Sequence, residues 1–140
     1  MRRQAGVAVF VHAAWSTWDR LPLLMGETER RIHRAISAKC AEMGAEVVAL
    51  GGVEDHVHLL ISLPPTIPLS RLIGEIKGAS SHLANHDART QDHFFKWQGA
   101  FGATSVSPRA LGEVKVYIAN QKAHHQEQSL IPEWEPHLDG

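Results

Sequence analysis

Two histidines, a tyrosine and a glutamine are the side chains of this sequence best suited to chemistry. His56 and His58 stand one residue apart in a strand-like segment, so both side chains point to the same face. Tyr117, the only tyrosine, stands four residues before Gln121, and on a helix this spacing gives both a common face. Imidazoles bind divalent transition metals, and a phenol can act as a nucleophile. Together the four side chains fit metal-assisted attack on a phosphodiester.

Each half of this set also has a purely structural interpretation. A His-x-His pair is often no more than two half-exposed strand side chains. Tyr117 shares a helical stripe with Val114 and Ile118, where a tyrosine is usually a core residue with its hydroxyl at the edge. A phenol has a pKa of about 10 and is a poor nucleophile unless a metal or base activates its target. From the residues alone, both interpretations stay open.

The composition is that of a single globular domain over residues 1–140. The chain is 44% hydrophobic and 21% charged. No apolar run reaches the roughly 18 residues that a membrane helix needs. The chain begins with a strand-like segment rather than a signal peptide, and its single cysteine suits a reducing compartment. We therefore expect a cytoplasmic protein that makes no use of a membrane.

Charge is distributed unevenly along the chain. The net charge is −1, but no Lys or Arg lies beyond residue 126, so residues 1–126 hold 14 basic and 11 acidic groups. This weakly basic part permits a phosphate-binding surface without demonstrating one. Residues 127–140, which include Pro132 and Pro136, are expected to form an irregular acidic tail.

The hydrophobic pattern predicts strands over residues 7–12, 46–50, 55–63 and 101–107, and helices over 27–43, 67–85 and 107–126. We expect Gly44 to end the first helix and Gly51-Gly52 to turn the chain between the second and third strands. We expect Thr66 to cap the second helix, and Ser107-Pro108 to begin the last helix. This order of elements is that of an α+β fold, a ferredoxin-like antiparallel sheet with an added C-terminal helix that carries Tyr117.

The third predicted strand orients the histidines within this fold. Val57, Leu59, Ile61 and Leu63 form one apolar face, which should pack beneath two helices. His56 and His58 then lie on the opposite face of the sheet, which the helices leave free for function.

Six short motifs, taken in order, resemble one family. They are VFVH at 9–12 followed by Ser16-Thr17, EDHVHLLI at 54–61, KGASS at 77–81, WQG at 97–99, SVS at 105–107 and YIANQKAHH at 117–125. This series is similar to that of the single-tyrosine transposases of small bacterial insertion sequences, which belong to the HUH endonuclease superfamily. The resemblance runs from about residue 7 to 130, and so covers nearly the whole chain.

The resemblance implies a specific mechanism. His56, His58 and Gln121 would be ligands of a divalent metal ion, Mg²⁺ or Mn²⁺, that polarises the scissile phosphate. Tyr117 would attack single-stranded DNA, leaving a 5′-phosphotyrosine and a free 3′-hydroxyl. Attack by another 3′-hydroxyl would rejoin strands, and no ATP is needed because the covalent link preserves the bond energy. The protein would be bacterial or archaeal, and associated with the nucleoid when bound.

The resemblance also implies partners. Members act as homodimers in which the tyrosine helix of one subunit meets the His pair of the other, in trans, and they bind DNA hairpins at element ends. Candidate DNA contacts here are Arg71, Lys77, Lys115, Lys122 and His124. The common alternative for each Lys or Arg is a solvated surface charge.

Two other functions compete with DNA transposition. A domesticated relative would use the same chemistry to process hairpins of chromosomal repeats, and the protein sequence cannot separate it from a mobile transposase. A ferredoxin-like sheet can also be a non-catalytic nucleic-acid-binding module, although the aromatic signature of the RNA-binding version is missing.

Overall fold

The computed structural model describes residues 7–86 and 94–136. Its strands are β1 (Phe10–Ser16), β2 (Glu46–Val53), β3 (His56–Ser62) and β4 (Gly102–Val106). The helices are α1 (Gly26–Glu42), α2 (Leu69–His86), α3 (Leu111–Ala119) and α4 (Gln121–Glu127). Short 3₁₀ turns occupy Trp18–Arg20, Pro108–Ala110 and Pro132–Trp134.

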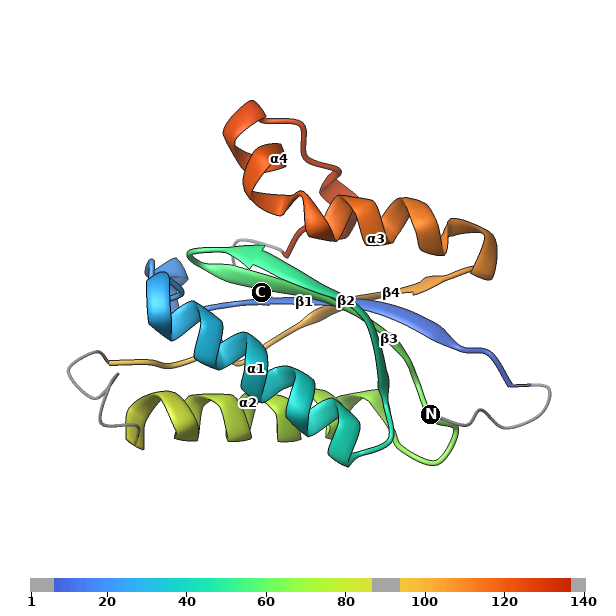
Figure 1. The fold of residues 1–140 in the computed structure, drawn as a ribbon, viewed down its shortest axis with the longest axis horizontal. Coiled ribbons are helices and arrows are strands. Elements are labelled where there is room, and N and C mark those ends of the chain that lie inside the picture. Colours follow the sequence, from blue (N-terminus) through green and yellow to red (C-terminus); the bar gives the residue numbers. More distant parts are fainter. Residues whose placement is uncertain (1–6, 87–93, 137–140) are drawn as a thin grey trace.

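The four strands form one antiparallel sheet in the order β2-β3-β1-β4. Helices α1 and α2 cover one face of this sheet, and α3 with α4 lies on the other (Figure 1). This is the α+β arrangement predicted from the sequence, with two helices on one face and an added C-terminal part. Among the described residues, no helix is long and apolar enough to cross a membrane.

The main core lies between the sheet and the helices α1 and α2. Val57, Leu59 and Ile61 of β3 are fully buried in it, as the alternating pattern predicts. A second, smaller core lies beneath α3, where Leu60 of β3 meets Val114 and Ile118. Because alternate residues of β3 face opposite cores, His56 and His58 belong to the side of the sheet that α3 and α4 cover.

The predicted turn at Gly51-Gly52 is wrong. Both glycines belong to β2, and the chain turns after them, at residues 54–55. They are needed for close approach instead, since a Cβ atom on Gly51 would lie 2.4 Å from the carbonyl oxygen of Ile118. The prediction for Gly44 is confirmed: it follows α1 with a positive φ of 80°.

Several predicted boundaries also differ. The first strand begins at Phe10 rather than at residue 7, and α2 begins at Leu69, too far along the chain for Thr66 to cap it. Ser107 precedes a 3₁₀ turn and makes no side-chain capping hydrogen bond. Part of the segment between the predicted helix 67–85 and the predicted strand 101–107 lies outside the described residues, while Phe95 and Trp97 of this segment are buried in the main core.

The single C-terminal helix expected over 107–126 is divided at Asn120, whose φ of −104° and ψ of 24° interrupt the helical geometry. Tyr117 therefore lies in the last turn of α3, and Gln121 begins α4. The predicted acidic tail is described only as far as residue 136. Within it, residues 129–136 return to the sheet and pack beside Tyr117, as the contacts below describe.

Candidate active site

The His pair lies in the middle of the sheet, and both side chains are fully buried. The Nδ1 atom of His56 lies 2.8 Å from an oxygen of Asp55, which also pairs with Arg20 at 3.3 Å. A proton on Nδ1 donates to this carboxylate and leaves the lone pair of Nε2 free. A carboxylate behind an imidazole in this way orients metal-binding histidines in many proteins.

His12 plays the corresponding part for His58. It lies on β1, next to β3, and its Nε2 atom is 2.9 Å from Nδ1 of His58. Burial, and then the proximity of His58, lower the pKa of His12 to about 4, so it is neutral at physiological pH. A neutral His12 can accept the Nδ1 proton of His58, and this again leaves Nε2 of His58 free.

Tyr117 and Gln121 face the His pair from the other side. The ring of Tyr117 makes an edge contact with His58 at a centroid distance of 6.1 Å and stacks on His124 at 4.6 Å. Tyr117 is 4% exposed and Gln121 is 1% exposed. Although α3 and α4 are separate helices, both side chains point toward the same carboxylate, as the prediction of a common face requires.

Glu135 joins the two halves of the site. One of its oxygens, Oε1, lies 3.0 Å from Nε2 of His56 and 3.3 Å from Nε2 of both His58 and His125. The other, Oε2, accepts a hydrogen bond from the hydroxyl of Tyr117 and lies 3.3 Å from the amide nitrogen of Gln121. All the candidate catalytic side chains thus converge on one carboxylate.

The electrostatics of the site follow from this convergence. Burial favours the neutral form of Glu135, but His56 and His58 outweigh it and hold the pKa of the carboxyl far below its usual range. Burial lowers the pKa of His56, but Asp55 and Glu135 outweigh it and raise the value overall. Burial, followed by the Glu135 hydrogen bond, raises the pKa of Tyr117 to about 12. The phenol is therefore neutral in this arrangement.

The donor set fits a divalent metal. Nε2 of His56 and Nε2 of His58 lie 3.0 and 3.3 Å from Oε1 of Glu135 as ion pairs; all three atoms are buried, and none of them makes a geometrically sound hydrogen bond among the described residues. Buried polar atoms without partners are unusual, and converging ones are typical of a metal site. His56, His125 and Glu135 also place one ligand atom each within 4.8 Å of one another. Imidazole nitrogens with a carboxylate suit Mn²⁺ and similar ions better than Mg²⁺.

The predicted DNA contacts lie in different places. Lys77 donates to the carbonyl groups of Gln98 and Ala100 and so holds the 97–100 segment on α2. Lys122 binds Glu29 at 2.7 Å and the carbonyl of Gly52 at 3.1 Å. His124 flanks the tyrosine, as described above, while Arg71 is exposed on α2 and Lys115 is exposed on α3, on opposite faces of the sheet (Figure 1). The structure therefore does not gather these residues into one surface.

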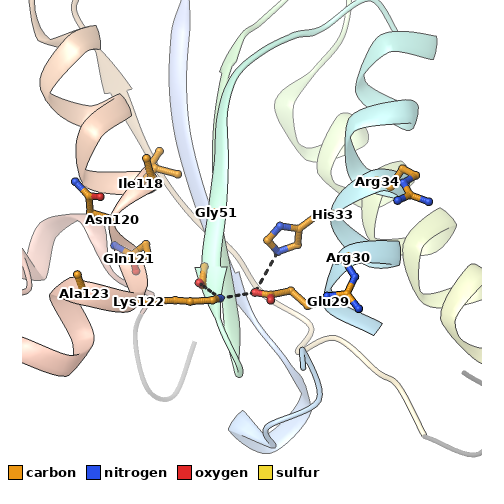
Figure 2. Close-up of a pocket in the computed structure, with 12 residues that line it drawn as sticks. Glu29, Arg30, His33, Arg34, Gly51, Ile118, Asn120, Gln121, Lys122 and Ala123 are labelled. Atoms are coloured by element: carbon orange, nitrogen blue, oxygen red, sulfur yellow. Dashed lines mark hydrogen bonds and ion pairs between the residues drawn. The ribbon is translucent and has the colours of Figure 1, made fainter. Parts of the chain in front are cut away.

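A pocket of about 590 Å³ opens next to the site, between α1, β2 and the junction of α3 and α4 (Figure 2). Gln121 lines it, and Lys122 crosses it to reach Glu29. Arg30 and Arg34 bring further positive charge from α1. Basic side chains and Gln121, a proposed metal ligand, thus line the same pocket.

Sequence reasoning did not predict the place of four residues in the site: His12, Asp55, Glu135 and His125. His12 and Asp55 could be linked to the His pair only through the pairing of β1 with β3 and through the turn before β3. Glu135 lies in a segment without periodicity, where it resembled any other acid of the tail. His125 was part of a recognised motif, but its place beside His56, at a ring distance of 4.8 Å, was not predicted.

Comparisons with known proteins find relatives over most of the chain. The family described as transposase IS200 like matches residues 7–121. The ISDra2 transposase TnpA of Deinococcus radiodurans is 31% identical over 114 residues, which cover 79% of this chain and 81% of that protein. A transposase of insertion sequence IS200 from Salmonella typhimurium is 26% identical over 70 residues, covering 50% of this chain and 46% of the relative.

Solved structures give the same fold. A crystal structure of a candidate transposase from Deinococcus radiodurans R1 superposes with a TM-score of 0.65 at 25% identity, covering 86% of this chain and 98% of that one. A REP-associated tyrosine transposase bound to a REP hairpin superposes with a TM-score of 0.67 at 18% identity, covering 89% and 73%. With its fold and most of its length matched in this way, the chain belongs to the IS200-like transposase family.

Proposed function

We propose that this protein cleaves and rejoins single-stranded DNA through a 5′-phosphotyrosine at Tyr117. One observation supports this most directly: the Tyr117 hydroxyl and the free nitrogens of His56 and His58 meet at a single carboxylate, that of Glu135. A nucleophile and a set of metal ligands converging on one anionic group are what attack on a phosphodiester requires.

The proposed step exchanges one phosphoester for another. The Tyr117 oxygen forms a bond to phosphorus, and the bond from phosphorus to the 3′-oxygen breaks. The phenol releases its proton and the departing 3′-oxygen takes one up, so the products are a 5′-phosphotyrosine and a 3′-hydroxyl. A second 3′-hydroxyl reverses the same step on another strand. Because the number of phosphoester bonds is constant, the cycle needs no ATP.

A divalent ion, Mn²⁺ or Mg²⁺, would be held by Nε2 of His56, Nε2 of His58 and the side chain of Gln121. When bound, it supplies positive charge that polarises the scissile phosphate and stabilises the departing 3′-oxygen. Asp55 and His12 orient the two imidazoles.

We infer that the DNA partner is a single strand bearing hairpins. A REP-associated relative of the same fold is bound to a REP hairpin. In this chain, the pocket rim with Arg30, Arg34 and Lys122 offers positive charge beside Gln121 for the strand that leads to the scissile phosphate. A mobile transposase and a domesticated relative share this chemistry, and hairpins close to both sides of the gene would indicate a mobile element.

The test compares wild type with Tyr117→Phe on single-stranded DNA from the sequences that flank the gene, with Mn²⁺ and with chelator. We expect cleavage and a covalent adduct only in wild type with metal, while the Phe variant still binds DNA. An adduct that persists in the Phe variant, or cleavage that is independent of metal, would contradict the mechanism. Binding without cleavage by either protein would show an inactive copy.

Homodimers with sites shared in trans stay a prediction. Within one chain, Tyr117 already lies beside His58, and the Lys122–Glu29 ion pair holds α4 to its own α1. Mixing Tyr117→Phe with His58→Ala protein tests the arrangement. Trans sharing predicts that mixed dimers regain cleavage, because they contain one intact site. Failure to regain it would refute trans sharing and support a site within a single chain.

A further inference from the structure

Residues 129–136 close the candidate active site. The backbone N–H of Ile131 donates to the Tyr117 hydroxyl at 3.0 Å, and the ring of Trp134 makes edge contacts with Tyr117 at 5.0 Å and with His12 at 6.1 Å. With this segment in place, His56 and His58 are fully buried. A DNA strand cannot reach the hydroxyl or the imidazoles while the segment holds this position.

Glu135 occupies the centre of the closed site in a particular way. Its Oε1 atom is shared among the three imidazoles, while its Oε2 atom accepts from the nucleophile. A scissile phosphate would have to occupy the same place, between the metal ligands and the Tyr117 hydroxyl that attacks its phosphorus. The carboxylate is therefore an anionic stand-in for the phosphate, supplied by the protein itself.

We propose that Glu135 is a ligand of the metal in the DNA-free protein and that the scissile phosphate displaces it. This inference rests on the proposed function, since it assumes that DNA reacts at Tyr117. Exchange of one anion for another keeps the charge near the imidazoles balanced, whereas expulsion of Glu135 without a replacement would leave the metal one ligand short. The segment 129–136 thus couples opening of the site to arrival of a phosphate.

The first test measures metal binding without DNA. Isothermal titration of Mn²⁺ is compared for wild type, Glu135→Gln and the control Glu133→Gln, which removes an exposed acid of the same segment. We expect at least a tenfold weaker Mn²⁺ affinity for Glu135→Gln and an unchanged affinity for the control. Equal affinities for all three proteins would refute the ligand role.

The second test uses the single tyrosine as a probe of closure. Nitration by tetranitromethane, followed at Tyr117 by mass spectrometry, should be slow in wild type because the ring is 4% exposed. We expect at least tenfold faster nitration in Glu135→Ala and the wild-type rate in Glu133→Ala, with circular dichroism confirming that both are folded. A wild-type rate in Glu135→Ala and Glu135→Gln alike would refute closure by Glu135.

Failure of this inference and failure of the proposed function give different results. Neither the Mn²⁺ titration nor the nitration involves DNA, so both can fail while wild type still forms its Tyr117 adduct. If Glu135 competes with DNA, Glu135→Ala should also lower the KM for single-stranded DNA at saturating Mn²⁺ by at least threefold. An unchanged or raised KM would contradict displacement, even in a fully active enzyme.

Discussion

The hydrogen bond between His12 and His58 allows a quantitative test of how the metal ligands are held. His12 is 3% exposed, and its Nε2 atom lies 2.9 Å from Nδ1 of His58, close enough to accept the proton of that nitrogen. His12→Leu keeps a side chain of similar bulk but removes the acceptor. His12→Gln keeps an acceptor oxygen on a side chain of similar reach, and is the matched control.

Two effects set the magnitude. Loss of a partner behind a metal-binding histidine typically weakens metal affinity by about 10- to 100-fold, which is about 1.4–2.7 kcal/mol. The Nδ1–H group of His58 is also left buried without an acceptor, at a cost of about 1–3 kcal/mol in the free energy of unfolding of the metal-free protein. We therefore expect His12→Leu to show both losses and His12→Gln to retain most of each property.

Isothermal titration with Mn²⁺ measures the first quantity, and urea denaturation in chelator measures the second. Cleavage by His12→Leu should return toward the wild-type rate as Mn²⁺ is raised, because the variant loses affinity for the ion and keeps the nucleophile. Wild-type Mn²⁺ affinity in His12→Leu would refute the role given to His12. Equal losses in the Leu and Gln variants would show that bulk, and not the hydrogen bond, is what matters.

Three further predictions concern other parts of the chain. Gly51→Ala should lower the free energy of unfolding by about 1–3 kcal/mol, because the new Cβ would lie 2.4 Å from the carbonyl oxygen of Ile118. Gly74→Ala is the control and should not lower it, because there is open space at that position. Urea denaturation measures both. Cys40 is fully buried, and burial raises its pKa to about 11. At pH 8 it should therefore stay a neutral thiol and react with Ellman's reagent only when the protein unfolds. Prompt reaction in the native protein would contradict this. Arg34→Ala should weaken binding of single-stranded DNA and reduce the slope of log affinity against log salt by about 0.7, whereas an unchanged slope would exclude a phosphate contact there.

The sequence was most informative where structure is local. Strand alternation correctly placed His56 and His58 opposite Val57, Leu59 and Ile61, because the period of a strand is independent of the rest of the fold. The order of elements was enough for the sheet topology, since few arrangements satisfy it. The orientation of the two histidines and the order of the strands could therefore be predicted, because both follow from the geometry of the sheet.

The errors lie where distant segments meet. Gly51 and Gly52 carry the composition of a turn, but their small size serves the approach of α3 and of β3, which no local pattern reveals. Asn120 interrupts the last helix although no proline marks the position. Glu135 reaches the site only because the chain reverses after α4, where Gln128 adopts a left-handed conformation with φ of 58°. Such contacts depend on the tertiary fold, and sequence periodicity carries no signal for them.

The distribution of the core explains how the site can open without unfolding. The metal-binding histidines His56 and His58 stand on β3, and their partner His12 stands on β1; both strands pack on the large core beneath α1 and α2. The nucleophile and Glu135 belong to α3 and the tail, which rest on the other face of the sheet through a smaller core around Leu60, Val114 and Ile118. Burial of apolar area is the main source of stability. The free energy needed to move α3 and the tail away from the sheet should therefore be lower than the free energy needed to deform the sheet itself. His56 and His58 can thus keep their positions while the segment that carries Glu135 moves away. Exchange of the carboxylate for a phosphate requires such a movement.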